Sequence, residues 1–444
     1  MPALYRFVRG LVRLGLNAYF RDIQVHGAEH LQGDGARVIV ANHNNGLIDP
    51  ILIIAASERP VTFIAKAPLF RIPILGWFLR NLGCIPAYRT QDPGYAREKN
   101  EQLFKDAADA LAAGPALAIF PEGKSHSEPQ LAEFKHGAAK IALEAETRQG
   151  NARIQLASLH FERTRGFRGR VLVQFGPPLL LGEFRERYER DARDATGTVT
   201  AEMHGRLSGM VLHAESDEIL RLAGLVDRMG VLEESGAPDL KSSFDRKKFI
   251  LDSYRRLREK VPAEVEALRV DLLRYQETLD LLTVRDAQVA EDYRLGRVLA
   301  FAARNALLLA FGLPFMALAL ACNFPPYLAC WTIAKAFGHE ADLRPTYGLI
   351  PALFIYPAYW AALAYGAWRL EDIPGMAAAL VAAPLSGLVA LHWMDRWHRV
   401  LVASWGLVAA LALPGARASL RRIRRRVLDR VKRLAETARE AGLQ

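Results

Sequence analysis

The chain of 444 residues is poor in cysteine, with only Cys84, Cys322 and Cys330. These three lie far apart and lack the spacing of a zinc ligand set, which excludes a disulfide framework and a cysteine-based zinc site. A reducing compartment suits them. The sequence also lacks a Gly-x-Ser-x-Gly nucleophile elbow, and His339-Glu340 has no second histidine to complete an HExxH motif. Two common hydrolase mechanisms are thereby excluded.

Acidic residues are fewer than basic ones, 48 against 58, so the formal net charge is +10. Surplus positive charge attracts anionic partners, and nucleic acid and an anionic membrane surface are the two candidates. A chain of this length predicts more than one domain. Its apolar residues are unevenly distributed, because the composition turns sharply apolar after Arg297.

The pattern predicts five regions. Residues 1–22 form an amphipathic helix, 23–200 an α/β domain, 201–297 a charged helical extension, 298–416 transmembrane helices and 417–444 a basic tail. In the α/β domain, strands expected at 36–42, 115–120, 153–161 and 170–176 alternate with helices at 50–57, 97–114 and 133–146. Alternation of this kind is typical of a mixed, largely buried sheet flanked by helices.

The first 20 residues place Arg6, Arg9 and Arg13 at helical spacing. The apolar residues of the opposite side are Leu4, Val8, Leu11 and Val12. A basic amphipathic helix suits a membrane interface, although an ordinary docking helix would show the same pattern. Arginines within the apolar run argue against a signal peptide.

The stretch "ANHNNGLIDP" (41–50) places His43 six positions before Asp49. On one helix these side chains would be rotated by about 600°, and on one strand they would lie about 20 Å apart. A turn over residues 44–46, followed by a helix capped by Asp49 with Pro50 in its first position, brings them together. Asp49 would then hold one ring nitrogen of His43, and the other could take a proton from a hydroxyl. Alternatively, Asp49 only caps a helix and His43 packs at a strand end.

A second stretch, "AIFPEGKSHSEPQLAEFK", follows another expected strand. The carboxylate of Glu122 could bind a polyol or orient a substrate, and Gly123 permits close backbone approach. Positive or hydroxyl groups suited to a phosphate are Lys66, Arg89, Lys124, Ser125 and Lys135. All of these lie near strand ends, so we expect them to converge on one cleft.

These stretches, in this order, resemble the phospholipid/glycerol acyltransferase (lysophospholipid acyltransferase-like) family over roughly residues 20–230. That family usually has Asn-His-x4-Asp, whereas this chain has one residue more. The longer spacing and "FPEGKSHSEPQL", with Ser125 where other members carry arginine, resemble the glycerol-3-phosphate/dihydroxyacetone-phosphate acyltransferase branch. The fourth motif of the family usually contains proline, and "RIQLASLHFER" has none.

The resemblance implies direct acyl transfer, with His43 as general base and Asp49 orienting it. The donor would be an acyl-CoA or acyl-carrier-protein thioester, and no cofactor or metal would be required. The acceptor would be glycerol-3-phosphate or dihydroxyacetone phosphate, with 1-acylglycerol-3-phosphate or another lysophospholipid as the alternative. A different class also remains, a non-catalytic lipid-binding or transport protein. The remaining histidines considered are expected to be structural or on the surface: His26, His30, His126, His136, His160 and His398.

The C-terminal third contains four apolar runs near spanning length, 305–322, 347–368, 375–393 and 400–416. Turns are expected at 369–372 and 394–399. The arginine-rich tail predicts a cytoplasmic C-terminus, and four spans place the catalytic domain on the same side. We therefore expect an integral membrane protein, of the inner membrane if bacterial. Next to a span, anionic lipid is a better partner for the tail than nucleic acid.

Overall fold

A computed structural model describes residues 3–71, 73–88, 97–126, 128–162, 167–234, 239–290, 295–337, 344–412 and 414–440. The chain divides into two compact units. The first comprises Met1–Val211 with Ala334–Tyr347, and the second comprises Leu212–Ile333 with Gly348–Gln444.

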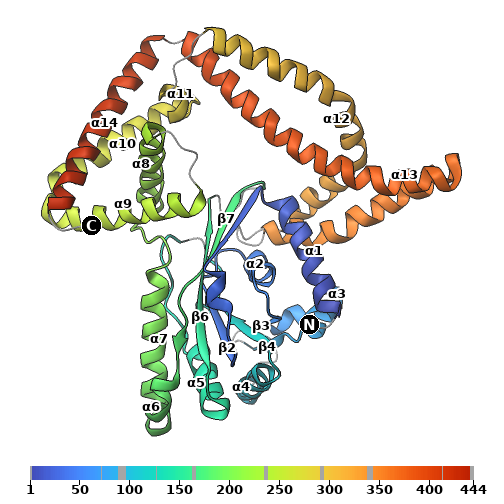
Figure 1. The fold of residues 1–444 in the computed structure, drawn as a ribbon, viewed down its shortest axis with the longest axis vertical. Coiled ribbons are helices and arrows are strands. Elements are labelled where there is room, and N and C mark those ends of the chain that lie inside the picture. The colour runs from blue at the N-terminus through green and yellow to red at the C-terminus, as the bar shows by residue number, and fades with distance from the viewer. Residues whose placement is uncertain are drawn as a thin grey trace. The chain divides into compact units, whose positions relative to one another are not determined.

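The first unit is built on an eight-stranded mixed sheet (Figure 1). Its main path runs in the order β1-β7-β6-β2-β5-β3-β4, and β8 pairs with β6. The strands are β1 (Asp22–His26), β2 (Arg37–Ala41), β3 (Val61–Lys66), β4 (Ile85–Ala87), β5 (Ala116–Ile119), β6 (Arg153–Phe161), β7 (Arg170–Phe175) and β8 (Leu179–Leu180). All pairings are parallel except those of β6 with β7 and β8. The predicted mixed α/β sheet is confirmed.

Helices cover both faces of this sheet. Alternate residues of β2 point to opposite faces, so Val38 and Val40 enter one core while Ile39 and Ala41 enter the other. The first core is closed by α4 (Arg97–Ala112), α5 (Gly137–Gln149) and α7 (Ala192–Ser208). The second is closed by α1 (Ala3–Tyr19) and α2 (Ile48–Ala56), with α3 (Pro73–Asn81) beside it. The first unit also contains α6 (Arg185–Arg190).

The elements differ from the predictions at specific places. The strand β1 and the helix α3 were not expected. Leu47, rather than Asp49, is the N-cap of α2, and Asp49 lies in its first turn. The helix α7 crosses the boundary expected at residue 200, and its Val199, Met203 and Leu207 are fully buried against the sheet unit.

The second unit contains a helical module of α8 (Asp217–Glu234), α9 (Leu240–Lys260), α10 (Pro262–Leu281), α11 (Asp286–Ala290) and α14 (Pro414–Glu440). Pro262 begins α10 directly after α9, where its fixed backbone angle suits a first helical position. The C-terminal helix α14 packs on α8 and α10 through Leu420 and Val427. At the centre, Tyr275 and Arg424 both donate to Asp286, at 2.6 and 3.0 Å. The basic segment is therefore part of a folded core, with Arg422, Arg425 and Arg426 exposed on its outer side.

Two very long apolar helices, α12 (Leu295–Phe337) and α13 (Arg344–Ala412), belong to the second unit except at residues 334–337 and 344–347. Within the described residues, two helical stretches are long and apolar enough to cross a membrane, Ala310–Phe337 and Tyr347–Trp405, whereas four spans were predicted. Asp372 interrupts α13 with non-helical angles (φ 57°, ψ −151°). Figure 1 shows α13 folding back on itself. The expected turn at 369–372 is thus present as a sharp kink. The turn expected at 394–399 is instead continuous helix.

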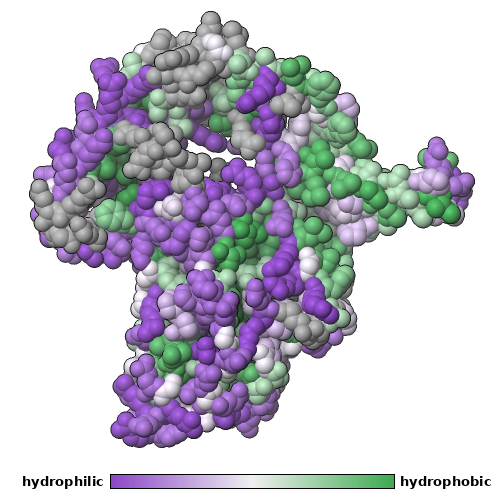
Figure 2. Space-filling view, in the orientation of Figure 1, coloured by the Kyte–Doolittle hydropathy of each residue, from purple (hydrophilic) through white to green (hydrophobic). Residues whose placement is uncertain are grey.

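Apolar side chains cover the outside of these helices. Phe311 and Phe315 on α12 are 76% and 62% exposed, and Trp405 on α13 is 51% exposed. Figure 2 shows this hydrophobic surface following α12 and α13, with a hydrophilic patch at the tip of α13. Contiguous exposed apolar surface of this extent marks contact with a membrane or another apolar partner.

Candidate active site

The sheet topology gathers the functional residues at one edge. Because β2, β5, β3 and β4 are parallel neighbours, their carboxyl ends share that edge. His43 follows β2, Glu122 follows β5, and Lys66 ends β3. The crevice outside the carboxyl ends of strands is the usual ligand site of an open α/β sheet.

The turn after β2 brings His43 and Asp49 into direct contact. The Nδ1 atom of His43 lies 2.9 Å from Asp49 Oδ2. The backbone N–H groups of Asn44 and Asn45 donate to the same oxygen, at 2.6 and 2.7 Å. A ring nitrogen that faces a carboxylate carries the proton, so Nε2 of neutral His43 is the unprotonated nitrogen. The predicted pairing of His43 with Asp49 through a turn is therefore present.

Asp49 is completely buried. Burial raises the pKa of its carboxyl group, and hydrogen bonds from His43, Asn45 and Asn44 oppose this shift. Its second oxygen, Oδ1, is buried and has no hydrogen-bond partner in the described part of the chain. Such a carboxylate can hold the imidazole in one tautomer and stabilise the imidazolium form.

Packing fixes the plane of the His43 ring. The ring stacks on Phe120, with centroids 4.2 Å apart and an angle of 19° between the planes. Among the described residues, none hydrogen-bonds to Nε2, and the side chain keeps 14% exposure. Asn42 anchors the strand end, because its side-chain amide exchanges two hydrogen bonds with the backbone of Leu159 on β6. His43 thus presents one unpaired nitrogen from a rigid position.

Glu122 contacts the protein rather than solvent. Its side chain is fully buried, and Oε1 accepts from the backbone N–H of His43 at 2.8 Å. The other oxygen, Oε2, accepts from the backbone N–H of Ala132 at 3.0 Å and from Nε2 of His126. His126 was expected to be structural or on the surface; its side chain is nine-tenths buried and contacts this carboxylate from the same loop.

The other predicted binding residues lie at the same edge with different exposure. Lys66, Lys124 and Lys135 are exposed, and Ser125 is half-buried. Gly123 has φ +74°, and a Cβ there would lie 2.5 Å from Lys135 Nζ, so the Lys135 side chain passes directly over this glycine. Arg89 lies outside the described residues. The phosphate-binding assignment of these side chains stays a prediction.

Comparison with known proteins agrees with this geometry. Residues 22–155 match the family model named Acyltransferase. Residues 22–155 belong to the acyltransferase family. This segment contains β1 to β5 and both stretches that hold His43, Asp49 and Glu122.

Curated relatives of the acyltransferase domain carry two activities in their names. A 1-acyl-sn-glycerol-3-phosphate acyltransferase of Chlamydomonas reinhardtii is 32% identical over 140 residues, 31% of this chain and 40% of the relative. A chloroplastic enzyme of the same name from Arabidopsis thaliana is 32% identical over 28% of this chain and 33% of its own length. Glycerol-3-phosphate O-acyltransferase 2 of Saccharomyces cerevisiae is 23% identical over 58% of this chain and 37% of its own length. The matches thus span two fifths or less of each relative.

Among solved structures, the 1-acyl-sn-glycerophosphate acyltransferase PlsC of Thermotoga maritima matches with a TM-score of 0.34 and 19% identity. That match covers 46% of this chain and 81% of the solved chain.

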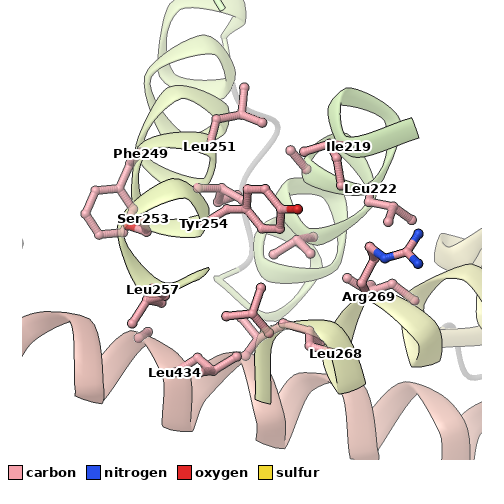
Figure 3. A pocket seen from close by; sticks show the side chains of 17 residues that line it. Ile219, Leu222, Phe249, Leu251, Ser253, Tyr254, Leu257, Leu268, Arg269 and Leu434 are labelled. Atoms are coloured by element: carbon pink, nitrogen blue, oxygen red, sulfur yellow. The ribbon is translucent and has the colours of Figure 1, made fainter. Parts of the chain in front are cut away.

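A separate hollow lies within the helical module of the second unit. It has a volume of about 150 Å³, and its wall comes from α8, α9, α10 and α14. Figure 3 shows Leu222, Tyr254, Leu268 and Leu434 surrounding it. The lining is almost entirely apolar, and Arg269 at its border pairs with Glu218 and Glu266. It therefore offers no acid–base chemistry.

Proposed function

We propose that this chain is a membrane O-acyltransferase that moves a fatty acyl group from a thioester to a hydroxyl of a phosphorylated glycerol. The observation that carries the proposal is the His43–Asp49 pair with its unpaired Nε2 at the sheet edge. The family membership of residues 22–155 supports it.

In the proposed reaction, Nε2 of His43 takes the proton of the acceptor hydroxyl as its oxygen attacks the thioester carbonyl. Asp49 stabilises the imidazolium that forms. The tetrahedral intermediate then collapses, the C–S bond breaks, and the thiolate leaving group takes the proton from His43. The products are the ester and a free thiol, and His43 returns to its neutral form. The donor is acyl-CoA or an acyl-carrier-protein thioester, and no cofactor is required.

The acceptor proposed is glycerol-3-phosphate or dihydroxyacetone phosphate. The Saccharomyces cerevisiae glycerol-3-phosphate O-acyltransferase aligns over more of this chain than the two plant-type relatives do, which supports this choice. The second candidate is 1-acylglycerol-3-phosphate or another lysophospholipid, which the names of those two relatives favour. In both cases we assign the acceptor phosphate to the basic and hydroxyl side chains Lys66, Arg89, Lys124, Ser125 and Lys135.

We also propose that α12 and α13 lie in a membrane and that α1 lies at its surface. The helix α1 buries Tyr5, Val8 and Leu16 in the domain and leaves Phe7 64% and Leu14 60% exposed. This second apolar stripe, beside Arg6, suits an anionic lipid interface. The exposed arginines of α14 suit the same lipids.

Contacts of the residues just before α12 and just after α13 limit how often the chain between them can cross a membrane. Arg421 donates to the backbone oxygen of Val289 at 2.8 Å, and Arg424 to Asp286 at 3.0 Å. Both ends thus belong to one folded module and lie on one side of a membrane, which requires an even number of crossings. Near the end of α13, Gln288 donates to the backbone oxygen of Val402, so this part of α13 lies on the module side as well. Because Val402 and Arg421 both lie on the module side, the segment 400–416 does not cross the membrane. Three of the predicted spans then remain, and an even number among them is two crossings.

A lipid-binding or transport protein without catalysis is the alternative from another class. The exposed hydrophobic surface and the apolar hollow would serve it equally well. An unpaired Nε2 on a histidine whose Nδ1 contacts a buried carboxylate favours the enzyme, because binding alone does not need this arrangement.

An acceptor panel tests the proposal directly. Purified full-length protein and a long-chain acyl-CoA, or the same acyl group on acyl carrier protein, are incubated with glycerol-3-phosphate, dihydroxyacetone phosphate or 1-acylglycerol-3-phosphate, and products are identified by mass spectrometry. We expect acylation of one of the first two, and a loss of at least about 100-fold in His43→Ala. Lack of product with every acceptor and with both thioester donors, from folded protein, would reject the enzyme. An equal rate in His43→Ala would reject the mechanism.

A further inference from the structure

The loop after β5 holds the backbone of His43 at both of its polar groups. The His43 N–H donates to Glu122 Oε1 at 2.8 Å, and the His43 carbonyl accepts from the backbone N–H of His126 at 3.0 Å. Asp49 contacts the ring of His43, whereas Glu122 and His126 form hydrogen bonds with its main chain. The ring is thus positioned by Asp49, in the first turn of α2, and by Phe120, whereas the backbone is positioned by Glu122 and His126.

Glu122 has little capacity left for a substrate. An ionised carboxylate offers about four acceptor positions, and three donors from the protein already occupy this one. Its side chain is fully buried. A buried carboxylate with three donors is a rigid element, because the loss of any donor leaves a desolvated charge partly unsatisfied.

His126 contributes the only side-chain donor of these three. Its side chain is nine-tenths buried, and its Nε2–H donates to Glu122 Oε2. Its Nδ1 is buried and has no hydrogen-bond partner within the described residues. The one polar contact of this ring is therefore with Glu122, which in turn contacts the backbone of His43.

From these contacts we propose that Glu122 and His126 form a clasp that positions the general base. His126 is a positioning residue that acts through Glu122, and Glu122 holds the His43 main chain in place of the substrate contact expected from the sequence. The inference rests on the proposed function of His43. Small displacements of a catalytic group, of about 1 Å, cost up to about 100-fold in rate.

The test uses the full-length protein with His126→Ala, which removes the donor, and His126→Gln, whose amide N–H can replace Nε2–H. We expect kcat to fall about 10- to 100-fold in His126→Ala, with the KM values for acceptor and donor changed less than about 2-fold. His126→Gln should recover most of kcat. His136→Ala is the matched control, because His136 forms a hydrogen bond with Thr200 and, among the described residues, none with His43.

Two kinetic outcomes would overturn the proposal. A raised acceptor KM with unchanged kcat would assign His126 and Glu122 to substrate binding. Equal losses in His126→Ala and His126→Gln would show that the hydrogen bond is not what matters.

Hydrogen–deuterium exchange provides a readout that does not depend on activity. The peptide covering residues 42–47 should exchange about 10-fold faster in His126→Ala, while the peptide covering β7 stays unchanged. Unchanged exchange at 42–47 would reject the clasp whether or not the protein acylates any acceptor. If His126→Ala does not fold, Glu122→Gln provides the same comparison, since it keeps the acceptor for the His43 N–H and loses the charge that His126 contacts.

Discussion

At the scale of single residues, the carboxylate of Asp49 is completely buried, and its hydrogen bonds are unevenly shared between its two oxygens. One of its oxygens accepts from His43, Asn44 and Asn45, and the other is buried with no hydrogen-bond partner in the part of the chain that the structure describes. A fully buried carboxylate is unfavourable for folding unless its hydrogen bonds compensate for the lost hydration. A carboxylate at this position therefore favours a role in chemistry rather than in stability.

Asp49→Asn should therefore inactivate the protein and yet stabilise its fold near neutral pH. Burial raises the pKa of Asp49, so the folded state binds this proton more tightly than the unfolded state. Wild-type stability from this group is fully present below about pH 4, the ordinary carboxyl value, and is lost as pH rises through the folded-state pKa. The asparagine of the variant does not ionise, so the variant does not lose stability in this way as pH rises. We expect its melting temperature to exceed that of the wild type by about 2–4 °C at pH 7.5, and the difference to vanish near pH 4.

Thermal unfolding followed by circular dichroism across this pH range checks the prediction. Asp22→Asn is the control, because Asp22 is partly exposed and pairs with Arg170, so its replacement should bring no gain. A variant that melts below the wild type at pH 7.5 would show that the hydrogen bonds to the ionised carboxylate outweigh its burial.

At the scale of elements, the hollow between α8, α9, α10 and α14 is a place where packing is incomplete. Ala223 lies on its wall and is nearly buried. Ala223→Leu adds three carbon atoms at a helical position, where leucine is well tolerated. We expect the free energy of unfolding to rise by about 0.5–2 kcal/mol, as is common when a cavity is filled.

Chemical denaturation of the detergent-solubilised protein measures this change. Ala223→Ser adds little volume and should give no increase. A lower stability in Ala223→Leu would mean that the lining side chains cannot move aside, since overpacking is itself destabilising.

Several elements could be predicted from the sequence because their signals are local. The run of β-branched residues in β2 and the turn before Asp49 are examples, and they sufficed to pair His43 with Asp49. The break expected at 394–399 was wrong, and one of its charged residues has a partner that only the fold supplies. Arg396 donates to Asn305, 91 positions away, at 3.4 Å. The role of His126 likewise depends on β2 and β5 being neighbours, which the local pattern does not show.

At the scale of the whole molecule, the proposed topology can be measured. In a background without Cys84, Cys322 and Cys330, single cysteines replace Asp280, Leu370 and Arg425, all of them exposed. With two crossings, positions 280 and 425 should react with a membrane-impermeant maleimide from one side only. Position 370, at the tip of α13, should react from the other side.

The alternatives give different patterns in right-side-out and inverted vesicles. Labelling of all three positions from one side would restore the four spans predicted from hydropathy. Labelling of 280 and 425 from opposite sides would contradict the even number of crossings, and with it the contact between Asp286 and Arg424. Hydropathy alone could not decide this, because the deciding contact joins residues 138 positions apart.

That contact also orders events during synthesis of the chain. Asp286 and Tyr275 leave the ribosome long before Arg424, and at about 5–20 residues per second the 138 residues between the two ends take roughly 7–30 s. During this time α8 and α10 lack their third partner, while the apolar helices between them and α14 are already emerging. The helical module can form completely only after α12 and α13 have been synthesised and have left the ribosome. The packing of α14 on α8 and α10 would then stabilise the positions of both ends of the apolar helices. A chain that ended before α14 would expose the apolar surface of α8 and α10 to proteases and chaperones.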